Sequence, residues 1–460
     1  MKSKPLFLLG FIITFLFVAC SGNTTVQNSS TTADLPDTSE TTIIATTNEN
    51  TITTSITTQV STTTELITTS PTTTEEITTA VILNYSVILE TYGGLLDSYI
   101  IENLQQNDIV TLPIPNKDGY VFCGWYLSIN SDVSIEEVTI TDSDITLHAD
   151  WASEGLYYEL INDDTEYEVS IGDVENLTSV SLPKFYQGKR VTRIAFQGFA
   201  YVETMEEIII PNTIVEIGNG AFLNAYNLQY ISLPDSVETI GNTAFRGCYS
   251  LEYFSVSENS LHLSSVDGVL FNKNQTVLIR YPQAKTNTEF IIPTSVIAVR
   301  EDAFGNNYFL TSIIITENVT TLSDHAFYNC TALISMTIPD NVTTVGIYLF
   351  RESGIQEVSL GAGLSEISSY MFYSCNQLES ITIPDNINSI GYAAFDGCSN
   401  LTSIIITRPA SSGFITGAVF MFVNTNLQLK IYFPDQGTLD LYKLETYWSS
   451  YKEKFEVYNS

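Results

Sequence analysis

Hydrophobic residues recur about every 23 residues through the C-terminal two thirds of the chain. A small or aliphatic residue followed by phenylalanine marks each repeat. These phenylalanines are Phe199, Phe222, Phe245, Phe304, Phe327, Phe350, Phe372, Phe395 and Phe420. A second series closes each isoleucine-rich element, at Pro211, Pro234, Pro293, Thr316, Pro339, Gly361, Pro384 and Thr407. Because both series share one period and one longer step of 59 residues, the pattern predicts an array of stacked repeats.

One repeat, from Leu228 to Leu251, shows what each position requires. Ile231 and Leu233 alternate as in a strand, so both side chains face one way. Pro234 then ends the pairing because it has no N–H to donate. Burying about six apolar side chains at ~2 kcal/mol each does not offset the cost of ordering a whole repeat at more than ~1 kcal/mol per residue. A single repeat should therefore not fold alone, and we expect the repeats to share one continuous interior.

Cysteine recurs three residues after the phenylalanine, where a small side chain can bond weakly to the backbone at a corner. These cysteines are Cys248, Cys330, Cys375 and Cys398. Cys375 and Cys398 occupy equivalent sites in adjacent repeats, so the sequence allows either a disulfide or two buried free thiols.

If the isoleucines of each strand point inward, the flanking and middle positions face outward and line up across the repeats. These outward positions are Glu207, Ile209, Tyr230, Ser232, Ser312, Ile314, Ser335, Thr337, Glu357, Ser359, Ser380, Thr382, Ser403 and Ile405. Our hypothesis is that this face, rich in hydroxyl groups, binds a protein or glycan through many weak contacts. The ligand-binding set that we predict is Glu207, Ile209, Tyr230, Ser232, Ser335, Thr337, Glu357, Ser359, Ser380 and Thr382. The alternative is that serine and threonine simply suit a solvated sheet.

Residues 81–152 alternate in the manner of short strands separated by turns. The segments Lys117–Tyr126 and Asp144–Trp151 resemble the internalin-type B repeat, or Listeria–Bacteroides repeat. The resemblance implies a β-grasp-like module that serves as a spacer or in adhesion. Trp125 and Trp151 either fill its small core or stack on a ligand. We expect Cys123 to belong to the same core.

The N-terminus has the pattern of a lipoprotein signal. Two lysines precede an apolar run from Pro5 to Ala19, which is too short for a membrane span. The sequence around Cys20 resembles a bacterial lipobox, which implies cleavage after Ala19 and a lipid on the Cys20 thiol. Residues 20–80 are rich in threonine and serine and nearly free of aromatics, so we expect a disordered tether.

The repeats resemble BspA-like leucine-rich repeats of bacterial surface proteins, from residue 153 to 460. The resemblance implies a mainly β fold: a right-handed leucine-rich-repeat solenoid with about 23-residue rungs, preceded by the β-grasp-like module and the tether. Capping units are implied at Tyr157–Asp163 with Tyr186–Thr192, and at Ile431–Pro434 with Tyr442–Tyr451. A longer unit with a hairpin is implied at Ser264–Lys273. The implied role is binding, and no ligand-binding residue carries over.

Charge and chemistry narrow the function further. The formal net charge of −34 opposes binding to nucleic acid. The three histidines, His148, His262 and His325, show no metal-ligand spacing, and no catalytic or nucleotide-binding motif is present. We therefore expect no enzyme, metal or cofactor, but a lipid-anchored protein on the outer face of a bacterial cell membrane. It would bind an extracellular protein or glycan as an adhesin. The alternative function is a structural coat or spacer protein without a specific ligand.

Overall fold

The computed structural model describes residues 60–61, 82–128, 131, 133–172 and 177–458. The predicted signal peptide, Cys20 and nearly all of the predicted tether lie outside the described residues. The strand β1 (Val60–Ser61) pairs with β2 (Ile82–Leu83).

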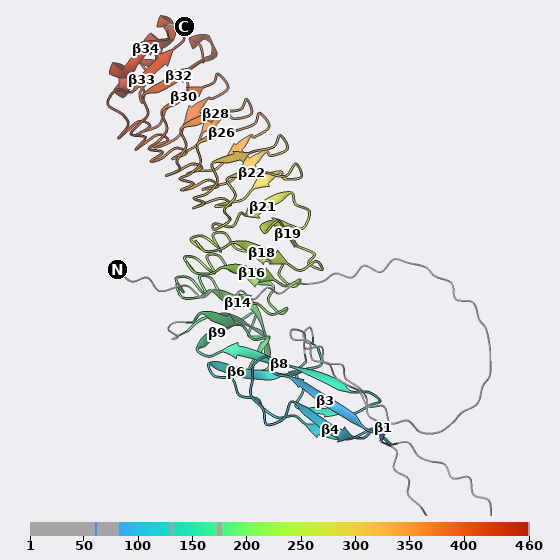
Figure 1. Ribbon diagram of the computed structural model, residues 1–460. Coiled ribbons are helices and arrows are strands. Elements are labelled where there is room, and N and C mark those ends of the chain that lie inside the picture. The colour runs from blue at the N-terminus through green and yellow to red at the C-terminus, as the bar shows by residue number, and fades with distance from the viewer. Residues whose placement is uncertain (1–59, 62–81, 129–130, 132, 173–176, 459–460) are drawn as a thin grey trace, which may run out of the picture. The chain divides into compact units, whose positions relative to one another are not determined.

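The repeats form a mainly β solenoid whose rungs follow one another from green to red in Figure 1. Each rung places one strand on each of two sides, which we call the A side and the B side. The A-side strands are β11 (Ser179–Ser181), β14 (Glu207–Ile209), β16 (Tyr230–Leu233), β18 (Tyr253–Val256), β22 (Glu289–Ile291), β24 (Ser312–Ile314), β26 (Ser335–Thr337), β28 (Glu357–Ser359), β30 (Ser380–Ile383), β32 (Ser403–Ile406), β33 (Lys430–Phe433) and β34 (Phe455–Val457). The B-side strands are β9 (Leu156–Ile161), β10 (Glu166–Ile171), β13 (Lys189–Ile194), β15 (Glu216–Ile217), β17 (Thr239–Ile240), β21 (Val277–Arg280), β23 (Ala298–Val299), β25 (Thr321–Leu322), β27 (Thr344–Val345), β29 (Glu366–Ile367) and β31 (Ser389–Ile390). Neighbouring rungs pair in parallel, as in β16 with β18 and β25 with β27, so the predicted solenoid fold is confirmed.

Two left-handed residues bend the backbone around the core phenylalanine in each of the rungs that contain one. They lie two positions before and two positions after the core aromatic residue, with φ between 49° and 81°. The residues before it are Gln197, Gly220, Thr243, Asp302, His325, Tyr348, Tyr370, Ala393 and Phe420; those after it are Tyr201, Asn224, Gly247, Asn306, Asn329, Glu352, Ser374, Gly397 and Asn424. Only glycine adopts this conformation without cost, so most rungs accept some strain here.

The core aromatic rings stack rung upon rung, as the period predicts. Centroid distances are 5.5 Å for Phe222 and Phe245, 5.4 Å for Phe304 and Phe327, and 5.2 Å for Phe372 and Phe395.

Two members of this column differ from the prediction. Phe420 is exposed, and Phe422 takes its place, 5.5 Å from Phe395. The prediction failed because this rung is longer, and its extra residues precede the aromatic pair. Tyr281 is a further member of the column of core aromatic rings that the sequence did not predict, and its ring centroid lies 5.4 Å from that of Phe304.

The interior divides into two clusters at the long unit, where we expected one. This unit contains the expected hairpin, formed by β19 (Leu263–Val266) and β20 (Val269–Asn272). The strands β17 and β21 do not pair, so the B-side sheet is interrupted. The Arg300 guanidinium donates across the gap to the Ile240 carbonyl at 2.6 Å. Asp302 and Arg280, both buried, form an ion pair of 2.5 Å at the same level.

Packed aromatic residues occupy both ends of the solenoid, partly buried at the first end and buried at the last. At the start, Tyr158 and Tyr186 stack with centroids 3.9 Å apart, and β12 (Phe185–Tyr186) pairs with β13. The last rungs carry η1 (Ala410–Ser412), α1 (Gln436–Tyr442) and η2 (Ser449–Lys454). Trp448 is fully buried there and donates its ring N–H to the Ile415 carbonyl at 2.8 Å.

The N-terminal module is built on one four-stranded sheet in the order β4-β3-β8-β6. These strands are β3 (Tyr85–Glu90), β4 (Ile100–Leu104), β6 (Tyr120–Tyr126) and β8 (Ile145–Ser153), and β5 (Ile109–Thr111) pairs separately with β7 (Glu137–Thr139). Trp125 and Trp151 are buried in its core, which confirms the first of the two interpretations. Cys123 is only half-buried and lies outside that core, because a bulge follows Phe122 in β6.

Candidate functional site

The outward positions of the A-side strands form the candidate binding face. Burial alternates along most of these strands: in β30, Ser380 and Thr382 are exposed while Ile381 and Ile383 are buried. Parallel pairing sets Ser380 beside Ser403 and Ser335 beside Glu357. The predicted side chains therefore lie outside the core and in register across rungs.

The face is not continuous. The A-side strands form separate sheets, and the long unit lies between β18 and β22. Tyr230, Ser232, Glu207 and Ile209 therefore lie before the interruption, whereas the other predicted binding residues lie after it.

Four predicted residues line one shallow hollow of about 320 Å³: Glu357, Ser359, Ser380 and Thr382. Glu207 and Ile209 line a different and larger pocket, toward the N-terminal module. The sequence-based set thus includes residues of two separate depressions, and Ser335 and Thr337 line neither of them.

Glu207 is held in place by two hydroxyl groups. The Ser179 hydroxyl donates to its carboxylate at 2.6 Å and the Tyr230 hydroxyl at 2.5 Å. The bond from Ser179, followed by that from Tyr230, lowers the pKa of Glu207 below its ordinary value. Tyr230 also stacks on Tyr253, an outward residue that our sequence analysis missed because it lies at the edge of the long unit.

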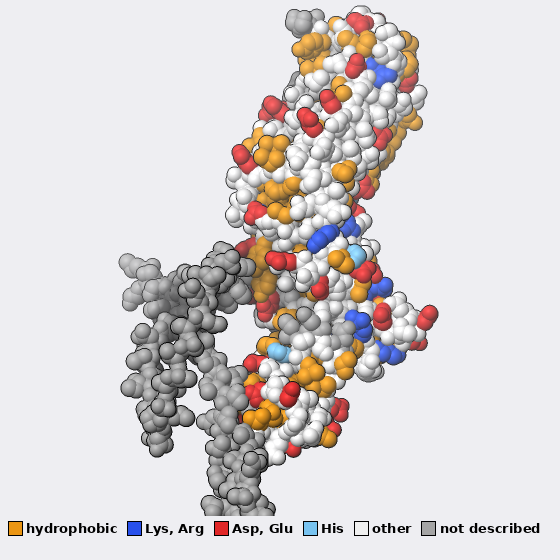
Figure 2. Space-filling model, turned by 90° about the vertical axis from the view of Figure 1, so that its right-hand side faces the viewer, with side chains coloured by type: hydrophobic (Ala, Val, Ile, Leu, Met, Phe, Trp, Pro, Cys, Tyr) orange, Lys and Arg blue, Asp and Glu red, His pale blue; other side chains and the backbone are white. Residues whose placement is uncertain are grey.

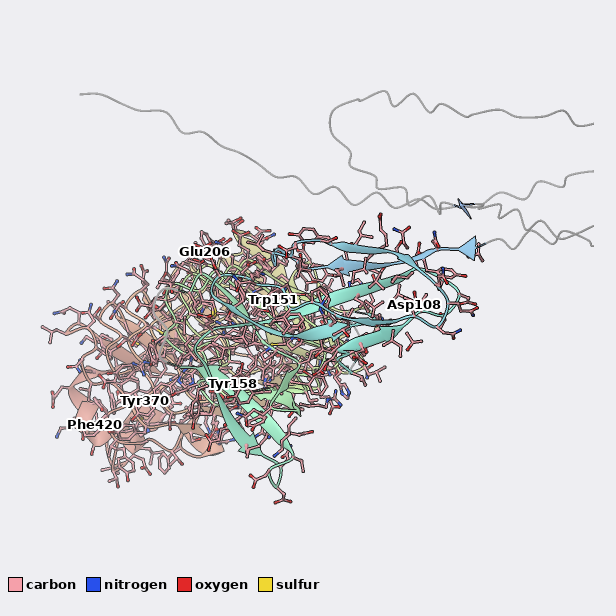
Figure 3. All side chains as sticks on the ribbon, turned by 90° about the horizontal axis from the view of Figure 1, so that it is seen from below. Asp108, Trp151, Tyr158, Glu206, Tyr370 and Phe420 are labelled. Carbon is pink, nitrogen blue, oxygen red and sulfur yellow. The ribbon has the colours of Figure 1, made fainter. Side chains whose placement is uncertain are left out.

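A strip of aromatic rings, half-buried at its first three residues and exposed at its last two, follows another edge of the solenoid. His325, Tyr348, Tyr370, Tyr392 and Phe420 are linked ring to ring at centroid distances between 4.4 and 5.5 Å. Tyr370 and Phe420 lie near one another at the margin of the molecule in Figure 3. The sequence signal that could have found this strip is the aromatic residue two positions before the core phenylalanine in several rungs.

The repeat cysteines form no disulfide, and each thiol donates to the carbonyl of a core phenylalanine. Cys375 donates to Phe350 at 2.9 Å and Cys398 donates to Phe372 at 3.0 Å. Burial raises the pKa of Cys375 to about 12, so the thiol is protonated and unreactive. The interpretation as buried free thiols is confirmed.

Charged groups on the surface are dispersed. Figure 2 shows acidic side chains scattered along one face of the molecule without a single large cluster. Among the described residues, no group of three histidine, cysteine or acidic side chains is arranged to hold a metal ion. None of the helices in the described part of the chain is long and apolar enough to span a bilayer.

The repeat geometry agrees with a family match. The model of the BspA type leucine rich repeat region matches the chain in six copies, over residues 173–290 and 283–402. The chain belongs to this family. Among curated proteins no sequence matches the chain.

Two solved structures are similar to this BspA-type repeat protein. A leucine-rich repeat protein from Eubacterium ventriosum is 26% identical, with 61% of this chain and 88% of that chain covered and a TM-score of 0.44. A leucine rich cell surface protein from Faecalibacterium prausnitzii is 27% identical, with 58% and 62% covered and a TM-score of 0.43.

Proposed function

We propose that this BspA-type protein is a lipid-anchored adhesin that binds an extracellular protein or glycan through the A-side face. The observation that carries the proposal is the register of this face. Outward hydroxyl and acidic side chains from successive rungs stand beside one another on a rigid parallel sheet, as Ser335 does beside Glu357. Such a surface offers many small contacts without a deep catalytic cleft.

The anchor and the module complete this proposal. Cleavage after Ala19 and lipidation of Cys20 would attach residues 20–80 to the membrane as a tether. Residues 81–152 would act as a spacer of the internalin B-repeat type, and residues 153–460 would present the solenoid outside the cell.

A pair of lysine substitutions tests the face. Thr337→Lys and Thr382→Lys place two long charged side chains on exposed positions of β26 and β30. We expect the double variant to lose adhesion to host cells and matrix by at least tenfold, because bulk and charge block close docking. The matched control adds the same charges at Thr343 and Ser365, which are exposed but lie outside the A-side strands.

The readout is cell adhesion by a strain that displays the full chain, with folding checked by circular dichroism. Equal adhesion of the A-side variant and the control would reject the A-side face. Saturable adhesion that neither variant alters would place binding elsewhere, and self-assembly without any adhesion would favour the coat or spacer function. Cys20→Ser tests the anchor separately: without the thiol that would carry the lipid, we expect the protein to be released from the membrane fraction.

A further inference from the structure

A pocket of about 570 Å³ lies where the module meets the first rungs of the solenoid. The module contributes Tyr92, Lys117 and His148, among others, and the solenoid contributes Glu207 and Ile209. This volume lies within the range of pockets that enclose small organic ligands.

Hydrogen bonds between the module and the solenoid hold the walls of this pocket. The Ser181 hydroxyl donates to the Trp151 carbonyl at 2.7 Å, and the Ser181 N–H donates to the Ser153 hydroxyl at 2.9 Å. Trp151, labelled in Figure 3, belongs to β8, which runs directly into the first strand of the solenoid. The Lys184 ammonium lies 4.2 Å from the Tyr126 ring centroid. The pocket is therefore preformed, which lowers the entropic cost of binding.

The charges that line the pocket contrast with the acidic chain around it. Two lysines, Lys117 and Lys184, balance the two acidic residues, Asp150 and Glu207, among its lining residues, and His148 also lines it. Asp150 lies beside Lys184, whose backbone N–H donates to the carboxylate at 3.4 Å. In a protein with a formal net charge of −34, this pocket is a local exception.

Lys117 has no acidic partner among the described residues. Its ammonium donates to the Tyr92 carbonyl at 3.2 Å and lies 4.1 Å from the Tyr120 ring centroid. Partial burial lowers the pKa of Lys117. An anion that enters the pocket would supply the negative charge that Lys117 lacks and would accept a charge-assisted hydrogen bond from its ammonium.

Other lining groups restrict what this anion can be. Glu207 remains ionised, so it repels a second negative charge and accepts hydrogen bonds from hydroxyl groups. Tyr92 is 51% exposed and its ring is stacked on His148, which leaves an aromatic surface at the rim. A ligand with one carboxylate, several hydroxyls and an apolar C–H face satisfies all three features, as a uronic or sialic acid unit does.

We propose that this pocket binds a carboxylate-bearing sugar unit, with the carboxylate against Lys117 and sugar hydroxyls against Glu207. The inference rests on the proposed binding function, because it names a ligand class for the module-facing end of the A side. It assigns recognition to the module and solenoid together, so neither part would suffice alone.

Calorimetric titration of the full chain tests the proposal with sialyllactose and a galacturonic acid disaccharide, and with lactose as the neutral counterpart. We expect saturable binding of at least one acidic sugar and none of lactose. Lys117→Gln should weaken binding at least tenfold, whereas Lys117→Arg should retain it. Lys273→Gln is the matched control, because it removes the same charge from an exposed turn in the long unit.

Each outcome has a consequence for the proposal. Binding that Lys117→Gln and Lys273→Gln leave equal would overturn the site, and so would equal affinity for acidic and neutral sugars. Binding of an acidic peptide or inorganic phosphate in preference to both acidic sugars would overturn the ligand class. If Lys117→Gln misfolds, Tyr92→Ala serves as the second variant and should also weaken binding. Sugar binding that survives Thr337→Lys with Thr382→Lys, while adhesion is lost, would separate this pocket from the rest of the A side.

Discussion

The replacement of Asp302 by asparagine should destabilise the solenoid at the long unit. The Asp302 side chain is 1% exposed, and it receives the Arg280 guanidinium at 2.5 Å and the Arg246 guanidinium at 3.0 Å. Asp302 also has a left-handed backbone, with φ of 60°. Asparagine tolerates that conformation and keeps the size of the side chain, so Asp302→Asn removes the charge and replaces one acceptor oxygen by an NH2 group.

The expected loss of unfolding free energy depends on the hydrogen bonds that Arg280 retains in the variant. Removal of one partner from a buried ion pair costs about 3–5 kcal/mol. The Arg280 guanidinium retains hydrogen bonds to the carbonyls of Asp302, Phe245 and Gly305 in the variant. Because these bonds remain, we expect a free-energy loss below that range, about 2–3 kcal/mol. Asp302→Ala should cost about 1 kcal/mol more, because alanine disfavours the left-handed conformation.

Urea denaturation followed by circular dichroism measures this loss, and tryptophan fluorescence locates it. A background with Trp125 and Trp151 replaced by phenylalanine leaves Trp448 as the single tryptophan, so fluorescence then reports the C-terminal rungs. Each repeat is stabilised by its neighbours. Weakening the long unit, where the two core clusters meet, should therefore separate the unfolding of the N-terminal rungs from that of the C-terminal rungs. Asp324→Asn is the control, since its carboxylate accepts a backbone N–H that asparagine can also bind. A loss below ~0.5 kcal/mol, or equal to that of the control, would refute the role assigned to the buried charges.

Three further predictions concern the rungs and the face. Thr243→Asn should stabilise the protein by about 1 kcal/mol in urea denaturation, because a β-branched residue is strained at φ of 55°; Thr344→Asn in an extended strand should not, and equal effects would contradict this reason. Cys248, Cys330 and Cys375 have pKa values raised to about 12 by burial, so native protein should resist a maleimide at neutral pH and react after unfolding; rapid native labelling of these thiols would show that the rungs open. The pKa of Glu207 is lowered in the folded state, so its hydrogen bonds stabilise the fold above its ordinary pKa of 4.5, and this contribution is lost as the pH falls through the folded pKa. Tyr230→Phe removes one of these bonds, so the variant should be less stable than wild type at neutral pH and should approach the wild-type stability in acid. A stability difference that does not change with pH would count against the bond.

The solenoid was predictable because the side chains that contact one another between rungs recur at a fixed spacing in the sequence. Phenylalanines 23 residues apart stack at the distance of neighbouring rungs, and the alternation in Ser380–Ile383 fixes which side chains face out. Phe420 was misplaced because spacing alone cannot detect extra residues within a rung. The left-handed positions were missed because residues as different as Gly220, Thr243 and Tyr348 occupy them, so no composition signal marks the turn.

The candidate sites were less predictable than the fold, because they depend on the module that lies beside the repeats. Glu207 and Ile209 were found as outward residues of one strand, but the pocket that they line also needs Lys117 and His148 from the module. No period relates Lys117 and His148 to Ile209, which follows them by 92 and 61 positions in the chain. The three residues come together only because β8 packs against β11.

The interruption at the long unit explains why the two ends of the A side can differ in function. Before it, the outward side chains include Glu207, Tyr230 and Tyr253, which are large and bonded or stacked to one another. After it, the exposed outward side chains include the small hydroxyl residues Ser335, Thr337, Ser359, Ser380 and Thr382. Small hydroxyl side chains suit a broad surface of weak contacts, whereas fixed aromatic and acidic groups suit one specific unit. If both ends act, the long unit sets the spacing between them, and a ligand that reaches both must be long enough to pass the hairpin of β19 and β20.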